Sequence, residues 1–184
     1  MRLFVALLPP ADALKEVEEA VAPLREPWSS LRWVAPELWH VTLAFLGEVS
    51  EDLLPDLTTR LERAAARHAR LTLSFAAAGA FPGNGAHARV VWAGVYGERR
   101  AFARLAAAIA AGARGAGVPA DHRPQHPHLT LARCRRRPAD VRPLIDGLSA
   151  FAGRPWTADA VHLMRSHQEP AIRYEPVASW PLRA

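Results

Sequence analysis

The sequence is poor in cysteine and contains no long uninterrupted apolar run. Cys134 is the only cysteine, so no internal disulfide can form, and this usage is typical of the reducing cytoplasm. No apolar run approaches the ~20 residues that a membrane-spanning helix needs. The charged, briefly apolar start at residues 1–10 shows no small-residue cleavage site, which favours a first strand over a signal peptide. We therefore expect a cytoplasmic protein that does not enter the membrane.

Lysine is also scarce, whereas arginine is abundant. Lys15 is the only lysine, so the formal net charge of +5 is carried almost wholly by arginine. Such a balance favours polyanionic partners through phosphate contacts, although GC-rich coding also yields chains rich in alanine and arginine. Charge alone therefore leaves the partner open. With 184 residues, half of them hydrophobic, the chain can bury one substantial core.

Two motifs of the form His-x-Thr-Leu stand in apolar runs, at residues 40–43 and 128–131. The two histidines are 88 positions apart in a chain of 184. Side chains two positions apart share one face of a strand, so His40 and Thr42 point the same way, as do His128 and Thr130. Unpaired polar groups are costly on a buried face. The motifs therefore predict two related halves, each giving one histidine and one hydroxyl to a shared cleft.

Hydrophobic periodicity predicts the elements around these motifs. Strands are expected at 2–8, 71–75, 88–95, 161–164 and 172–180, and around each motif. Helices are expected at 11–24, 102–109 and 141–148, and from an N-cap at Ser50 through residue 61. The prediction is an α+β fold: a single domain over residues 1–184 with two lobes from an internal duplication. Two antiparallel sheets would flank a central cleft, with helices outside.

The motifs and their flanks resemble the two-histidine phosphoesterases, in particular the bacterial and archaeal RNA 2′,3′-cyclic phosphodiesterases, historically called 2′-5′ RNA ligases. The resemblance covers the opening strand (2–10), both motif regions (32–34 with 40–49, and 127–133), the middle strand (90–94), and Tyr174 with residues 180–182 at the end. Gln125-His126 and the insertion-like segment 83–87 depart from the pattern. They leave the motif residues untouched and bear on substrate preference.

The resemblance implies metal-independent hydrolysis of RNA 2′,3′-cyclic phosphate ends to 2′-phosphomonoesters, without a cofactor, and 2′-5′ ligation as the reverse reaction. His40 would donate a proton to the departing oxygen, and His128 would deprotonate water. Thr42 and Thr130 would donate hydrogen bonds to the nonbridging phosphate oxygens. A histidine pair suits these roles because its pKa values lie near neutrality.

Two further residues are expected to bind substrate. By resemblance Arg133 would clamp the phosphate, and Phe45 could stack on a nucleobase. Each follows its histidine by five positions. Strict alternation would turn both side chains to the opposite face, so these roles require a bulge or the end of a strand.

Other readings remain open. His122, His126 and His128 have a spacing that could suggest a metal site, although no second His or Cys cluster accompanies them. The triplet at 135–137 is either a solvated turn or an RNA contact. The absence of a glycine-rich phosphate loop argues against an ATP-dependent ligase. The alternatives to the RNA enzyme are a phosphodiesterase for small cyclic nucleotides or tRNA fragments and a non-catalytic RNA-binding module. A monomer is the default expectation.

Overall fold

In this computed structural model, which describes residues 1–121 and 126–184, nine strands form one antiparallel sheet. The sheet order is β7-β4-β5-β6-β3-β1-β8-β9, with β2 paired to β6 outside this path. The strands are β1 (Arg2–Leu7), β2 (Arg32–Trp33), β3 (Val41–Glu48), β4 (Leu71–Phe81), β5 (Val90–Gly97), β6 (His128–Arg133), β7 (Trp156–Ala158), β8 (Ala160–His167) and β9 (Arg173–Pro181). The helices are α1 (Ala11–Arg25), α2 (Leu54–Ala66), α3 (Arg99–Gly115) and α4 (Arg142–Gly147), with 3₁₀ turns η1 (Pro36–Leu38) and η2 (Glu51–Leu53).

The prediction of two separate sheets is wrong, because hydrogen bonds join all nine strands into one sheet. The two motif strands, β3 and β6, are direct neighbours, and they pair at Val41 and Leu129. Both residues are 0% exposed, so burial of these apolar side chains holds the two strands together. This one pair joins the β3 half of the sheet (β3, β1, β8, β9) to the β6 half (β2, β6, β5, β4, β7).

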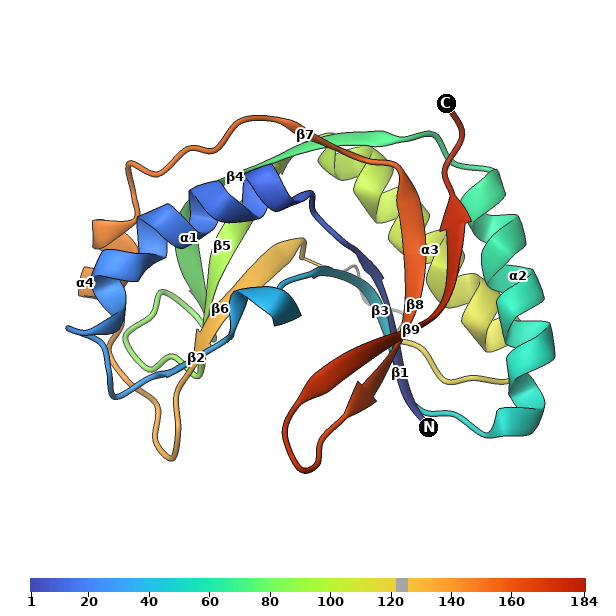
Figure 1. Cartoon of the computed structure of the whole chain (residues 1–184), viewed down its shortest axis with the longest axis horizontal. Coiled ribbons are helices and arrows are strands. Elements are labelled where there is room, and N and C mark those ends of the chain that lie inside the picture. Colours follow the sequence, from blue (N-terminus) through green and yellow to red (C-terminus); the bar gives the residue numbers. More distant parts are fainter. Residues whose placement is uncertain (122–125) are drawn as a thin grey trace.

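The helices cross between the two halves. Helix α1 follows β1 but packs against β4, and α3 follows β5 but packs against β3 and α2. Figure 1 shows α1 and α4 beside the β6 half and α2 and α3 beside β8 and β9. The apolar spacing predicted for the third helix is confirmed, since Phe102, Leu105 and Ile109 are fully buried. Each long crossover therefore ties one half of the sheet to the other.

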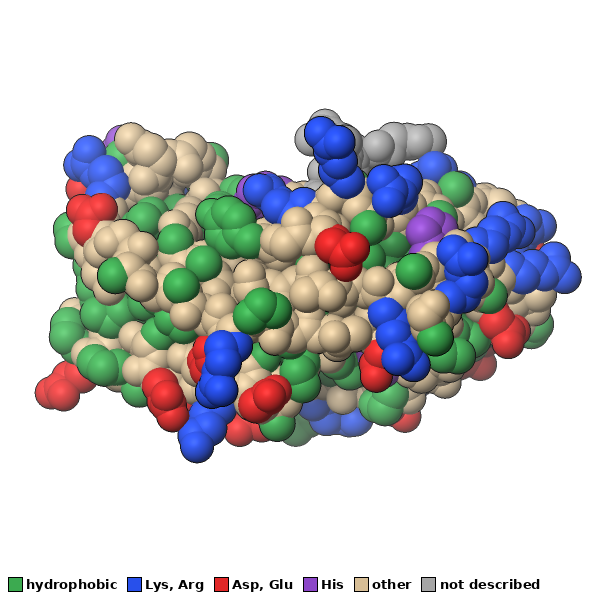
Figure 2. Space-filling model, turned by 90° about the horizontal axis from the view of Figure 1, so that it is seen from above, with side chains coloured by type: hydrophobic (Ala, Val, Ile, Leu, Met, Phe, Trp, Pro, Cys, Tyr) green, Lys and Arg blue, Asp and Glu red, His purple; other side chains and the backbone are tan. Residues whose placement is uncertain are grey.

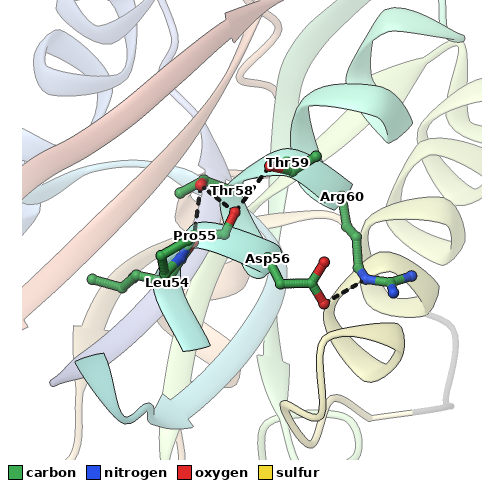
Figure 3. A network of polar contacts seen from close by, with 6 residues as sticks. All are labelled: Leu54, Pro55, Asp56, Thr58, Thr59 and Arg60. Carbon is green, nitrogen blue, oxygen red and sulfur yellow. Dashed lines mark hydrogen bonds and ion pairs between the residues drawn. The ribbon is translucent and has the colours of Figure 1, made fainter. Parts of the chain in front are cut away.

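Helix α2 begins with a polar network. The hydroxyls of Thr58 and Thr59 donate hydrogen bonds of 2.9 Å to carbonyl oxygens of the first helical turn, around Pro55 (Figure 3). Asp56 accepts a 2.8 Å hydrogen bond from the Arg60 guanidinium one turn later. Such an exposed pair contributes little stability, but it anchors the start of the helix.

Three local features differ from the sequence prediction. Ser50 precedes η2 rather than α2, and its side chain makes no capping hydrogen bond. Strand β4 continues to Phe81, well beyond the predicted end at residue 75. The short strand β7, which begins at the buried Trp156, was not predicted because three residues give too little periodicity.

Bulges bend the sheet at four strands. Extra residues stand in β3 (Leu43 and Leu46), β6 (Leu131), β4 (Ala77) and β9 (Val177), where the register against the neighbouring strand shifts. Bulges increase local twist and bend the strand that carries them. The sheet is accordingly strongly curled (Figure 1).

Candidate active site

The two motif histidines have the same backbone environment. His40 directly precedes β3, and His128 is the first residue of β6. Nδ1 of His40 lies 2.8 Å from the carbonyl oxygen of Leu38, and Nδ1 of His128 lies 2.6 Å from the carbonyl oxygen of His126. A carbonyl oxygen can only accept, so Nδ1 carries the hydrogen in both rings. Nε2 is therefore the nitrogen left to exchange a proton with a ligand.

The pairing of Val41 with Leu129 brings the two motifs together. Continuing this antiparallel register sets His40 opposite Thr130 and Thr42 opposite His128. Thr42 is only 7% exposed, and neither threonine hydroxyl makes a hydrogen bond to the part of the chain that the structure describes. Nearly buried polar groups normally have a partner. The site thus holds hydroxyls that are available to a ligand.

His40 is packed between two aromatic rings from distant strands. Its ring centroid lies 4.7 Å from that of Phe4 in β1 and 5.3 Å from that of Tyr174 in β9. The two aromatic rings also contact each other, at 4.9 Å. Phe4, Ala6 and Met164 form a small apolar cluster separate from the main core, with Tyr174 against it. This cluster fixes the imidazole on the face opposite the helices.

His128 has an aromatic wall of its own. Its ring lies 5.1 Å from Phe81 and 6.3 Å from Trp92, and the same two rings contact His126 at 5.8 and 4.9 Å. Gly79 makes this wall possible, because a Cβ at that position would lie 2.3 Å from the indole of Trp92. The indole therefore crosses directly over the neighbouring strand and supports the histidine.

Burial lowers the pKa of both motif histidines below the ordinary value. For each ring the loss of hydration is the largest cause, the hydrogen bond to the backbone carbonyl opposes it, and neighbouring positive charge lowers the pKa further. For His40 that charge comes from His128 and Arg133, and for His128 from His126 and Arg133. Both imidazoles thus favour the neutral form until an anion arrives.

Arg133 and Phe45 reach the same face as the motif residues because both strands bulge. The extra residue is Leu131 in β6 and Leu43 in β3, each between the motif threonine and the residue five after the histidine. Phe45 is 58% exposed between buried neighbours, and the charge of Arg133 acts on both histidines. The bulge that the sequence required for these two positions is present in each strand.

The metal reading of the sequence rests partly on His122, which lies outside the described residues. Within residues 1–121 and 126–184, no group of three His, Cys, Asp or Glu side chains could hold a metal ion. His126 and His128 instead pack against Phe81 and Trp92. The prediction that no metal takes part stays a prediction.

Four aromatic residues contact the motif histidines, and the sequence did not predict these contacts. Phe4, Phe81, Trp92 and Tyr174 come from four strands that only long-range register brings together. The family resemblance covers Trp92, in the middle strand, and Tyr174, but it assigns a role to neither. The available signal was the glycine at position 79, because a glycine inside a strand often marks a close approach.

The comparisons with known proteins agree with this geometry. The model of the 2′-5′ RNA ligase superfamily matches residues 9–170, and the chain belongs to this family. A Thermus thermophilus relative named RNA 2′,3′-cyclic phosphodiesterase is 34% identical over 177 residues, which cover 92% of this chain and 84% of the relative. An Escherichia coli relative of the same name is 31% identical over 182 residues, covering 98% and 96%. A Geobacillus stearothermophilus relative, also of that name, matches 82% of this chain and 47% of its own length.

Solved structures have the same fold. A crystal structure of a Thermus thermophilus protein superposes with a TM-score of 0.81 at 31% identity and covers 100% of this chain and 99% of that one. Escherichia coli LigT in its apo form gives a TM-score of 0.76 at 28% identity, covering 100% and 98%. The family resemblance seen in the sequence is confirmed. In the described part of the chain, no helix is both long and apolar enough to cross a membrane.

Proposed function

We propose that this chain is a metal-independent RNA 2′,3′-cyclic phosphodiesterase that opens the cyclic phosphate to a 2′-phosphomonoester. The observation that carries the proposal is the pair of His-x-Thr strands joined at Val41 and Leu129, where neither threonine hydroxyl makes a hydrogen bond to the residues that the structure describes. The names of the relatives support the same activity, since three of them are RNA 2′,3′-cyclic phosphodiesterases. Crystal structures of Escherichia coli LigT with 3′-AMP and with phosphate are consistent with a phosphate site in that relative.

In the proposed reaction, Nε2 of His128 removes a proton from water as the water oxygen bonds to phosphorus. The bond from phosphorus to the 3′-oxygen breaks, and Nε2 of His40 gives its proton to that oxygen. Thr42 and Thr130 donate to the nonbridging oxygens as negative charge builds there. A bound phosphate raises the pKa of the neighbouring imidazoles, which offsets the effect of burial and supplies the protonated form.

The reaction needs one protonated and one neutral histidine. The two backbone contacts are alike, so the assignment of His40 as acid and His128 as base comes from family resemblance. Exchanging the two roles gives the reverse reaction, joining a cyclic phosphate to a 5′-hydroxyl in a 2′-5′ bond. This reversal stays a prediction.

Substrate binding is assigned to two residues beyond the motifs. Arg133 makes no ion pair with the described residues, its charge acts on both histidines, and it would hold the phosphate. Phe45 offers an exposed ring within β3, the strand that follows His40, and a nucleobase could stack on this ring. RNA fragments with cyclic ends, such as tRNA fragments, are the expected substrates. Small cyclic nucleotides carry the same reacting group.

The proposal includes a single two-lobed domain that arose by internal duplication. Three matched features support it: the histidine contact with the carbonyl two residues earlier, the bulge after each threonine, and the substrate residue five positions after each histidine. The cytoplasmic location and the monomeric state stay predictions.

The decisive experiment uses an oligoribonucleotide that ends in a 2′,3′-cyclic phosphate, in excess EDTA. Wild type should convert the end to a 2′-phosphate, identified by mass spectrometry and by resistance to nucleases that need a free 2′-hydroxyl. His40→Ala and His128→Ala should each lower kcat by at least about 10³-fold, since each removes a general acid or base and its positioning.

Three other outcomes would point elsewhere. Activity that EDTA abolishes would support the metal site built on His122, His126 and His128. Binding of the RNA without turnover by wild type would support the non-catalytic module. Turnover of mononucleoside 2′,3′-cyclic phosphates alone would support the small-nucleotide reading.

A further inference from the structure

Two arginines stand directly opposite each other at the edge of the candidate site. Arg32 in β2 pairs with Arg133 in β6, so their side chains leave the same face of the sheet. Both are exposed, and within residues 1–121 and 126–184 neither makes a hydrogen bond or an ion pair. Like charges directly opposite in a sheet are destabilising. Two successive phosphates bound by these two side chains would remove that cost.

The chain continues from this pair into a basic turn. Arg135, Arg136 and Arg137 are exposed, and no carboxylate among the described residues pairs with them. The acidic residue that follows, Asp140, is held by Arg142 at 2.7 Å. Three residues span at most about 11 Å, so Arg136 lies within that reach of Arg133. Four exposed arginines therefore lie on a short stretch of chain that begins at the site.

On the β8–β9 hairpin, the charged side chains have a carboxylate partner, on the face opposite Tyr174. There Arg173 and Arg165 lie near Glu175, whose pKa is lowered chiefly by its hydrogen bond to His167 and also by these two arginines. The Glu175 carboxylate lies 2.7 Å from Nε2 of His167. The hairpin arginines thus share a carboxylate, whereas the side chains of Arg32, Arg133 and residues 135–137 pair with none among the described residues.

We propose that the RNA chain leaves the site along the β2–β6 edge, with Arg32 binding the phosphodiester next to the cyclic phosphate and residues 135–137 binding the phosphates beyond it. This inference rests on the proposed function. In that function Arg133 binds the cyclic phosphate that reacts, so Arg32 is available to bind the next phosphate of the RNA chain. A single-stranded RNA of three or more nucleotides would contact the whole edge, whereas a mononucleotide would reach only Arg133.

Positive charge alone does not identify this path. Figure 2 shows that Lys and Arg side chains also gather at the end of the molecule where α2 lies. Arg63, Arg67 and Arg70 at that end are exposed as well. What distinguishes the β2–β6 edge is its register with Arg133, which connects it to the histidines. The α2 arginines therefore provide a matched control that removes the same charge elsewhere.

The test compares a ten-nucleotide RNA ending in a 2′,3′-cyclic phosphate with a mononucleoside 2′,3′-cyclic phosphate. Arg32→Gln should raise KM for the RNA about tenfold, the loss expected for one charged hydrogen bond, and leave kcat within twofold. The variant R135Q/R136Q/R137Q should lower the salt dependence of RNA binding, with the slope of log K against log salt reduced by about 2 for three contacts. Both variants should hydrolyse the mononucleotide as wild type does.

The control variant R63Q/R67Q/R70Q should leave the KM for RNA and the salt slope unchanged. Equal losses on the mononucleotide and the RNA would overturn the proposal, as would an effect in the control as large as that of the β2–β6 variants. A binding measurement separates the proposed RNA path from the proposed function. It uses fluorescence anisotropy to monitor binding of the same RNA with a 2′-phosphate end. If wild type binds RNA in the predicted arginine-dependent way but hydrolyses neither substrate, the proposed function fails while the path stands.

Discussion

The contact between each histidine Nδ1 and a backbone carbonyl governs how this site responds to pH. Both imidazoles are held in one tautomer with Nε2 free, and burial lowers the pKa of both. The unfolded chain therefore takes up protons on these groups before the folded chain does. Stability is fully present above the unfolded value of 6.5 and decreases as the pH falls from there toward the folded pKa values.

We accordingly expect the thermal unfolding temperature of the wild type to decrease as the pH is lowered from 7.5 to 5.5. The double variant His40→Asn/His128→Asn should lose less over the same range, because two of the responsible groups are gone. His126 and His162, whose pKa values burial also lowers, maintain the remaining slope. Carboxyl groups with a lowered pKa, such as Asp140 at about 2 and Glu18, titrate below this range. Calorimetry at matched ionic strength measures the slopes, and parallel slopes would contradict the assignment.

At the level of the elements, alternation along a strand predicted the faces of the motif residues but not the bulges. Leu43 and Leu131 are ordinary strand residues, and nothing in their identity marks an extra residue. The bulge is set by pairing with β1 and β5, which a single sequence does not reveal. The same holds for the aromatic rings around the histidines, which depend on register between distant strands. Periodicity did predict the main helices and every strand except the short β2 and β7.

Gly79 offers a test of how one strand supports another. Gly79→Ala would put a methyl group 2.3 Å from the Trp92 indole, so the indole must move away from His128. We expect a loss of about 1–3 kcal/mol in the free energy of unfolding, typical of overpacking, together with reduced kcat. Gly147→Ala is the matched control, because its new methyl group would meet Leu24 at an ordinary 3.7 Å. Urea unfolding and turnover are measured on both, and unchanged turnover in Gly79→Ala would show that the indole does not position the histidine.

At the scale of the whole molecule, a narrow junction and two crossing helices have opposite effects on how firmly the two halves of the sheet are held together. Among the described residues, Val41 and Leu129 are the one strand pair that the two halves of the sheet share, and such a narrow junction would let the halves move apart. Helix α1 and helix α3 each begin in one half and pack on the other, which joins the halves into one core. Most buried residues of both halves belong to that one hydrophobic cluster, apart from the small cluster of Phe4, Ala6 and Met164. Cooperative unfolding in a single transition follows from this arrangement.

The junction can be weakened without touching the catalytic groups. Leu129→Ala should cost about 2–5 kcal/mol, as buried leucine truncations do, and should keep a single calorimetric transition. Turnover should fall as well, because the truncated pair no longer fixes His40 against His128. Leu163→Ala, equally buried in β8 but away from the junction, should cost similar stability and keep turnover at a temperature where both variants are folded. Two resolved transitions in Leu129→Ala would mean instead that the halves are separate folding units and that the helices do not couple them.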